Sequence, residues 1–185
     1  MKAYLTMCFV FWLGTGVGQN VFAQGKRAAH AQTKRQAVDV WEEAATTQVK
    51  TYVLRLLPGQ DLRLELERFT KTKRIQAGFI VTGVGSLRKA ALRLADKSET
   101  TQFDGKFEIV SLVGTLTPDG PHLHLSLSDG TGKTIGGHLT PGCEVYTTVE
   151  IVIGDAVGLK MTREPDAQSG YNELKVRPAT PRKRR

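Results

Sequence analysis

The sequence predicts an α+β domain in which a mainly antiparallel β-sheet packs against one principal helix. Apolar segments of strand length recur between residues 50 and 162, and Gly, Pro and Asp residues separate them at close intervals. One segment, residues 61–73, instead has apolar residues at helical spacing. An apolar content of 40% with 19 glycines in 185 residues is ordinary for a globular protein, which excludes a wholly disordered chain.

The expected elements follow a simple order. A first strand at residues 50–57 leads through a Pro-Gly turn to Asp61, whose carboxylate suits the N-cap of a helix that continues to Lys73. Seven further strands are expected at residues 77–84, 90–95, 105–115, 121–128, 134–140, 144–154 and 155–162.

Residues 1–23 have the pattern of a secretory signal peptide. A weakly cationic start precedes a short apolar run, and Val21 and Ala23 occupy the −3 and −1 positions of a cleavage site. An uncleaved anchor and a buried helix are the alternatives, but three glycines interrupt the apolar run. We therefore expect an exported protein, periplasmic or secreted, with no transmembrane segment in the mature chain.

Composition divides the remaining chain into a polar linker (24–49), a compact domain (50–176) and a basic disordered tail (177–185). The formal charge is +8, yet the domain holds 16 Lys and Arg against 15 Asp and Glu. The tail carries five basic residues and no acidic one. A contact with DNA or another polyanion would therefore depend on the tail, at Arg182, Lys183, Arg184 and Arg185.

The two cysteines exclude a disulfide framework and a zinc module built on cysteine pairs. If the signal peptide is removed, Cys8 goes with it, and Cys143 then has no partner within the mature chain. We expect Cys143 to be a small buried apolar residue.

Three of the four histidines lie within seventeen residues. His122 and His124 are two residues apart, so on a strand both imidazoles leave the same face. A five-residue loop, 129–133, would place Ser128 opposite Thr134 and therefore His124 opposite His138. The spacing predicts that one hairpin brings all three histidines together, beside a Gly-Gly pair without side-chain bulk.

Three neutral imidazoles are the ligand set of an open zinc site, with the fourth position left for water, a carboxylate or a substrate atom. Iron, nickel, copper and manganese also accept imidazole. An anion site and a merely polar strand face are the other readings. We therefore predict a divalent metal, with zinc first, at His122, His124 and His138.

Whether the protein is an enzyme stays open at this level. Glu108, Asp129, Glu144 and Glu150 are candidate bases by residue type alone, and Glu150 in its apolar strand more readily faces solvent or a subunit interface. The sequence has no GxSxG motif, no P-loop and no GxGxxG fingerprint.

From Tyr52 to about Val176 the chain resembles the PPC domain, the "plants and prokaryotes conserved" domain. The similarity rests on the segments Arg-Leu-Leu-Pro-Gly-Gln-Asp-Leu (55–62), Gly-Val-Gly-Ser-Leu (83–87) and Gly-Lys-Phe-Glu-Ile-Val (105–110). It also includes Gly-Gly-His-Leu (136–139), which ends the histidine hairpin as in prokaryotic members.

The resemblance implies an α/β fold with a mainly antiparallel sheet, a homotrimer, and a metal site, with zinc as the first choice, formed by the three histidines. It also implies an alternative function, because plant members with AT-hooks bind DNA. The Arg-Gly-Arg-Pro core of an AT-hook is absent from this sequence. We thus expect an exported, trimeric three-histidine metal-binding module of unknown ligand or substrate, with DNA binding as the alternative.

Overall fold

The computed structural model describes residues 47–179. The predicted signal peptide, nearly all of the predicted linker, and the cationic residues 182–185 lie outside the described residues. Within residues 47–179, no helix combines the length and the apolar character needed to cross a membrane.

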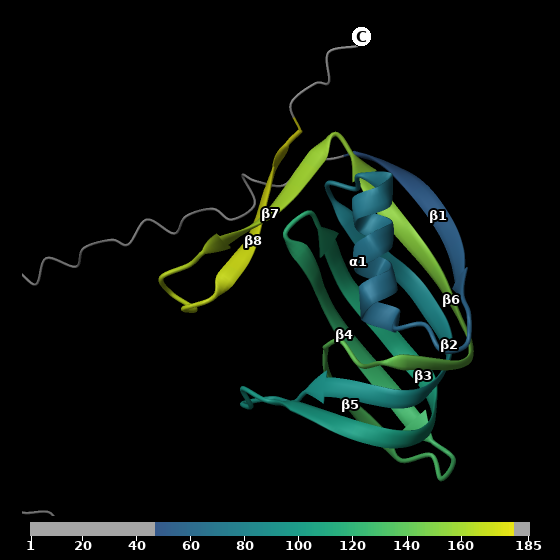
Figure 1. Ribbon diagram of the computed structural model, residues 1–185. Coiled ribbons are helices and arrows are strands. Elements are labelled where there is room, and N and C mark those ends of the chain that lie inside the picture. Colours follow the sequence, from purple (N-terminus) through teal and green to yellow (C-terminus); the bar gives the residue numbers. More distant parts are fainter. Residues whose placement is uncertain (1–46, 180–185) are drawn as a thin grey trace, which may run out of the picture. The chain divides into compact units, whose positions relative to one another are not determined.

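Eight strands and one helix make up the described residues, which confirms the predicted α+β class (Figure 1). Six strands form one antiparallel sheet in the order β1-β6-β2-β3-β4-β5, and β7 and β8 form a separate two-stranded sheet. The elements are β1 (Gln48–Leu56), α1 (Leu62–Lys73), β2 (Gly78–Arg93), β3 (Thr100–Thr117), β4 (Gly120–Asp129), β5 (Thr134–Leu139), β6 (Glu144–Val157), β7 (Leu159–Pro165) and β8 (Asn172–Pro178).

Helix α1 begins where the sequence predicts and covers one face of the six-stranded sheet (Figure 1). The Asp61 carboxylate accepts a hydrogen bond from the backbone N–H of Leu64 at 2.9 Å, which satisfies one of the free donors at the helix start. Its second oxygen accepts from the N–H of Gly142 at 2.6 Å. Asp61 therefore caps the helix and also ties it to the connection between β5 and β6.

The core lies between α1 and the sheet. Leu62 and Leu66 of the helix are fully buried, as are alternate residues of β4, which makes the opposite alternation of β4 the face away from the helix. Cys143 is buried in this core, as predicted, and burial raises its pKa to about 11.

Strand β2 is one continuous strand, so the expectation of separate strands at 77–84 and 90–95 was wrong. The Gly-Val-Gly sequence at residues 83–85, where the first of the two expected strands ended, lies in a bulged part of the continuous strand. A Cβ on Gly85 (φ +142°) would lie 2.1 Å from the carbonyl oxygen of Thr148, so glycine allows β6 to approach there. The full length of β2 lets its last residues also pair with β5.

Two strand boundaries near the C-terminus also differ from prediction. Strand β6 continues through residue 155 to Val157, and Gly158 (φ +87°) makes the break. Strand β8, a short strand of mixed polar and apolar residues, was not predicted from the sequence. Arg177 and Pro178 belong to β8, so the expected start of the tail at residue 177 lies inside a strand.

Candidate metal centre

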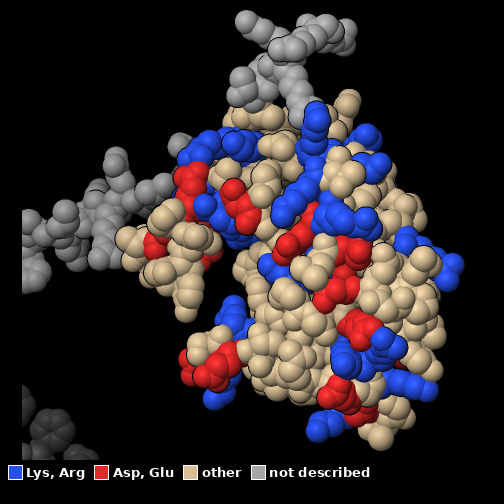
Figure 2. Space-filling view, viewed as in Figure 1, with Lys and Arg blue, Asp and Glu red and all other residues tan. Residues whose placement is uncertain are grey.

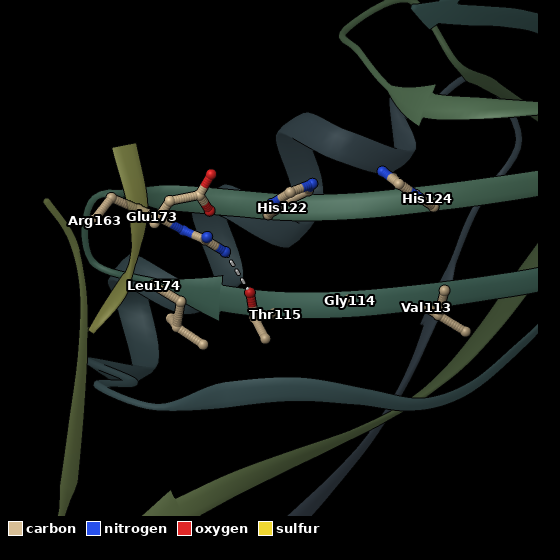
Figure 3. A pocket seen from close by; sticks show the side chains of 8 residues that line it. All are labelled: Val113, Gly114, Thr115, His122, His124, Arg163, Glu173 and Leu174. Atoms are coloured by element: carbon tan, nitrogen blue, oxygen red, sulfur yellow. Dashed lines mark hydrogen bonds between the residues drawn. The ribbon is translucent and has the colours of Figure 1, made fainter. Parts of the chain in front are cut away.

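The alternation of side chains along β4 places His122 and His124 on the same face of the sheet. Leu123, Leu125 and Leu127 of β4 point into the core, so His122 and His124 leave the strand on the face away from α1. Figure 3 shows both imidazole rings on the same side of β4.

The hairpin register supplies the third histidine, as the sequence analysis predicted. Ser128 pairs with Thr134, and His124 pairs with His138 on β5. The ring centroids are 5.1 Å apart for His122 and His138, and 5.3 and 5.7 Å apart for the other two pairs. One ring nitrogen from each residue lies within 4.8 Å of the other two. A tetrahedral ion at 2.0–2.1 Å would draw these nitrogens to roughly 3.4 Å from one another, a change that imidazole rotation can supply.

His138 is the most enclosed of the three side chains. Its Nδ1 atom is buried and has no hydrogen-bond partner among the residues that the structure describes. Burial, with smaller contributions from the neighbouring His122 and Arg93, lowers the pKa of His138 to about 4. A neutral imidazole with a free ring nitrogen is the form that a metal ion requires, so His138 fits the role of a ligand.

His122 is more exposed than His138, but its pKa shifts in the same direction. Burial lowers its pKa, and the positive charge of Arg163 lowers it further, while the carboxylate of Glu173 acts in the opposite direction. The loss of solvation and the neighbouring cation therefore both favour the neutral, metal-binding form of His122.

Helix α1 contributes to the position of the two histidine strands. The Arg63 guanidinium donates to the backbone carbonyl of Leu139 at 3.0 Å and to that of Pro121 at 3.4 Å. These residues directly follow His138 and precede His122. Arg63 is also paired with Glu67 at 3.1 Å, so its own direction is restrained.

Strand β2 completes the support of β5. Its last residues, Leu92 and Arg93, pair with Leu139 and His138. A Cβ on Gly137 would lie 2.8 Å from the carbonyl oxygen of Arg93. The Gly-Gly pair therefore provides room for the backbone of β2, and the closeness of the two strands holds His138 in register.

A hollow of about 360 Å³ opens beside His122 and His124 (Figure 3). Strand β3 forms one side through Val113, Gly114 and Thr115. The β7–β8 hairpin forms another through Arg163, Glu173 and Leu174. The histidine cluster thus borders a space with both charged and aliphatic walls.

None of the four predicted candidate bases lines this hollow. Asp129 accepts hydrogen bonds from the backbone of Thr131 and Lys133 and shapes the hairpin loop. Glu144 is paired with Arg88, Glu108 lies opposite Ser128, and Glu150 is exposed, as the sequence analysis favoured.

Glu173 is the acidic residue that the sequence analysis missed. It lies about fifty residues from the first two histidines and reaches their hollow only because β8 folds back on β7. No local sequence pattern marks it.

Together the fold and the site define a β-rich domain that presents a three-histidine cluster on its sheet. A family model described as the Plants and Prokaryotes Conserved domain, abbreviated PCC or PPC, matches residues 43–157. This match covers more than half of the chain, which therefore belongs to the Plants and Prokaryotes Conserved family.

Solved structures of similar proteins share this fold. A hypothetical protein from Salmonella enterica is 43% identical with a TM-score of 0.72, over 74% of this chain and 99% of that one. A metal-containing protein from Archaeoglobus fulgidus is 28% identical with a TM-score of 0.61, and a PPC protein from Pyrococcus horikoshii is 30% identical with a TM-score of 0.58. Both comparisons cover 71% of this chain and 98% of the other.

Curated relatives are much longer than the matched segment. The "Bifunctional protein GlmU" of a Synechococcus strain is 52% identical over 139 residues, which are 74% of this chain and 22% of that protein. The "AT-hook motif nuclear-localized protein 13" of Arabidopsis thaliana is 27% identical over 118 residues, 57% of this chain and 26% of that protein. The chain thus spans about a fifth to a quarter of these relatives.

The environment of His138 predicts a pH effect on the metal-free protein. Its imidazole should titrate near pH 4, below the usual 6.5, in an NMR titration of the histidine ring protons. Because the unfolded chain takes up this proton near pH 6.5 and the folded chain does not, the free energy of unfolding should fall between about pH 6.5 and 4.

The variant His138→Gln serves as the control for the stability measurement. Its urea midpoint should decline less over the same pH range, because the titrating group is gone. An unshifted titration of His138 in the wild-type protein would contradict the assignment of its environment.

Proposed function

We propose that the protein is an exported, homotrimeric metal-binding module that holds a divalent cation, zinc by preference, through His122, His124 and His138. The observation that carries this proposal is the convergence of three ring nitrogens within 4.8 Å, together with the buried Nδ1 atom of His138, which has no hydrogen-bond partner in the described part of the chain. A buried polar atom without a partner costs free energy, and a cation bound at Nδ1 would remove that cost. The metal-containing relative from Archaeoglobus fulgidus supports the same choice.

Three imidazoles leave a fourth position of a tetrahedral ion open. An open position takes water or an exchangeable ligand, whereas structural zinc sites are closed by four protein ligands. The hollow beside His122 and His124 gives such a ligand a place to bind. The site therefore fits ligand binding, or chemistry on a bound ligand, better than a purely structural ion.

Metal content tests this proposal. The wild-type protein, purified without chelators, should contain about one zinc per protomer by inductively coupled plasma mass spectrometry. Each of the single variants His122→Ala, His124→Ala and His138→Ala should lose at least about 90% of that zinc, because two imidazoles bind far less tightly than three.

His30→Ala is the matched control, since it removes the remaining histidine of the sequence and leaves the hairpin intact. Its zinc content should equal that of the wild type. Zinc that stays in all three cluster variants would contradict the proposed site.

Exposed aliphatic side chains support the homotrimer. Outside the hollow, five valines of β1, β2 and β3 are each more than half exposed in the protomer: Val49, Val53, Val81, Val84 and Val110. Burial of apolar surface contributes about 25 cal/mol of favourable free energy for each Å² removed from water. This gain favours burial of these strands between copies of the chain.

Light scattering coupled to size-exclusion chromatography measures the assembly. The wild-type protein should have three times the protomer mass, and the double variant Val84→Glu with Val110→Glu should dissociate because it places charges in the proposed interface. Leu64→Glu, at a residue of α1 that is also half exposed, should leave the mass unchanged. A wild-type mass equal to one protomer would overturn the trimer.

DNA binding is the second candidate. It is supported by the similarity to the AT-hook relative and by the basic residues Arg182, Lys183, Arg184 and Arg185. The charge of the domain gives it little support, because Lys and Arg are interspersed with Asp and Glu over the face seen in Figure 2. Export would also separate the protein from chromosomal DNA.

An electrophoretic shift assay at increasing salt distinguishes the two candidates. If the tail alone contacts phosphates, deletion of residues 180–185 should abolish any shift, and binding by the full chain should weaken steeply with salt. Recovery of the protein from the periplasm, with an N-terminus at Gln24, would support the exported metal-binding module. A salt-resistant, sequence-specific shift by the cytoplasmic protein would favour DNA binding instead.

A further inference from the structure

We propose that the hollow beside the histidines binds a small organic carboxylate, with Arg163 as the residue that recognises the carboxylate group. This inference rests on the proposed metal function and assigns a ligand class to the same site.

Arg163 is a half-buried guanidinium without a carboxylate partner. Ion pairs in residues 47–179 join Arg63, Arg68, Arg88 and Arg177 to glutamates, and none of them includes Arg163. Glu173 lines the same hollow but makes no ion pair with Arg163 within 4.0 Å. A half-buried cation in this state is available to an anion from solution.

Neutral groups and the backbone hold Arg163 in place. One guanidinium nitrogen donates to the Thr115 hydroxyl at 2.7 Å, as the dashed line in Figure 3 shows. The backbone N–H of Arg163 donates to the Asp119 carboxylate at 2.9 Å, which fixes β7 against the turn between β3 and β4. The remaining guanidinium N–H groups can donate two parallel hydrogen bonds to a planar partner such as a carboxylate.

A second arginine lies beside His138, outside the set of residues that line the hollow. Arg93 of β2 is directly opposite His138 in the sheet register. It also makes no ion pair with a carboxylate in the described part of the chain. With a divalent cation at the histidines, the positive charge around the hollow exceeds the single negative charge of Glu173. A monoanionic ligand therefore suits the site better than a neutral or cationic one.

The walls determine which kind of anion fits. Val113 and Leu174 line the hollow with aliphatic surface, and its volume of about 360 Å³ exceeds what an inorganic anion fills. A short branched carboxylic acid would place one end at the metal and Arg163 and its aliphatic end against these two side chains. This complementarity favours an organic carboxylate over inorganic phosphate.

Calorimetry on the zinc-loaded full-length protein tests the assignment with four probes: 3-methylbutanoate, its neutral analogue 3-methylbutanamide, acetate and inorganic phosphate. We expect 3-methylbutanoate to bind at least about tenfold more tightly than the amide, because only the acid offers charge-assisted hydrogen bonds. It should bind at least about fivefold more tightly than acetate, which lacks the aliphatic end. Equal affinity for acid and amide, or tighter binding of phosphate, would overturn the proposal.

Variants distinguish a specific contact of Arg163 with the ligand from a general effect of the protein's positive charge. Arg163→Gln should weaken 3-methylbutanoate binding at least about tenfold, and Arg163→Lys should restore only part of that loss, because lysine has no planar fork. Arg88→Gln removes an equal charge from an exposed ion pair outside the hollow and should bind as the wild type does. Equal affinities of the Arg163→Gln and Arg88→Gln variants would contradict the role of Arg163.

Zinc content and circular dichroism are measured on every variant. Normal zinc content with no preference for the carboxylate would overturn this inference and leave the metal proposal standing. Absence of zinc from the wild type would overturn the metal proposal. In that case the same titrations are carried out on the metal-free protein. Loss of the preference for acid over amide in Arg163→Gln would support the role of Arg163, and an unchanged preference would overturn it.

Discussion

The pairing of β4 with β5 is the constraint on which the proposed site depends. This register places His138 opposite His124, and strand alternation adds His122 to the same face. A slip of one residue would turn the imidazole of His138 to the other face. Pairing of Leu92 and Arg93 with β5 opposes such a slip, because the end of β2 holds β5 from its second edge.

Helix α1 strengthens the same arrangement from the core side. Asp61 caps the helix and binds the N–H of Gly142, and Arg63 donates to backbone carbonyls beside two of the histidines. The helix therefore buries apolar surface and also fixes the strands that carry the cluster. Because each contact joins segments far apart in the chain, the geometry of the cluster depends on the whole folded domain.

Cationic side chains outnumber acidic ones around the histidine cluster. Burial and neighbouring cations lower the pKa of His122 and of His138, which favours the neutral imidazole that binds a metal. Arg163 and Glu173 come from the separate β7–β8 sheet, beyond the residues that the family model matches. The core sheet thus presents the imidazoles, and the hairpin adds the groups that select what binds next to them.

Much of the fold and part of the site could be predicted from local sequence. The capped helix follows from Asp61 and helical periodicity, and the histidine pairing follows from a five-residue loop in an antiparallel hairpin. The continuity of β2 could not be predicted, because the glycines at 83 and 85 mark a turn as readily as a bulge.

The sequence by itself thus determined the α+β class, the family resemblance and the shared face of the three histidines, since these depend on short-range periodicity and loop length. Only the tertiary structure decided that Arg163 and Glu173 lie beside them and that the buried Nδ1 atom of His138 has no hydrogen-bond partner within residues 47–179. Those features depend on contacts between distant segments, and no local pattern in the chain records which distant residues will meet.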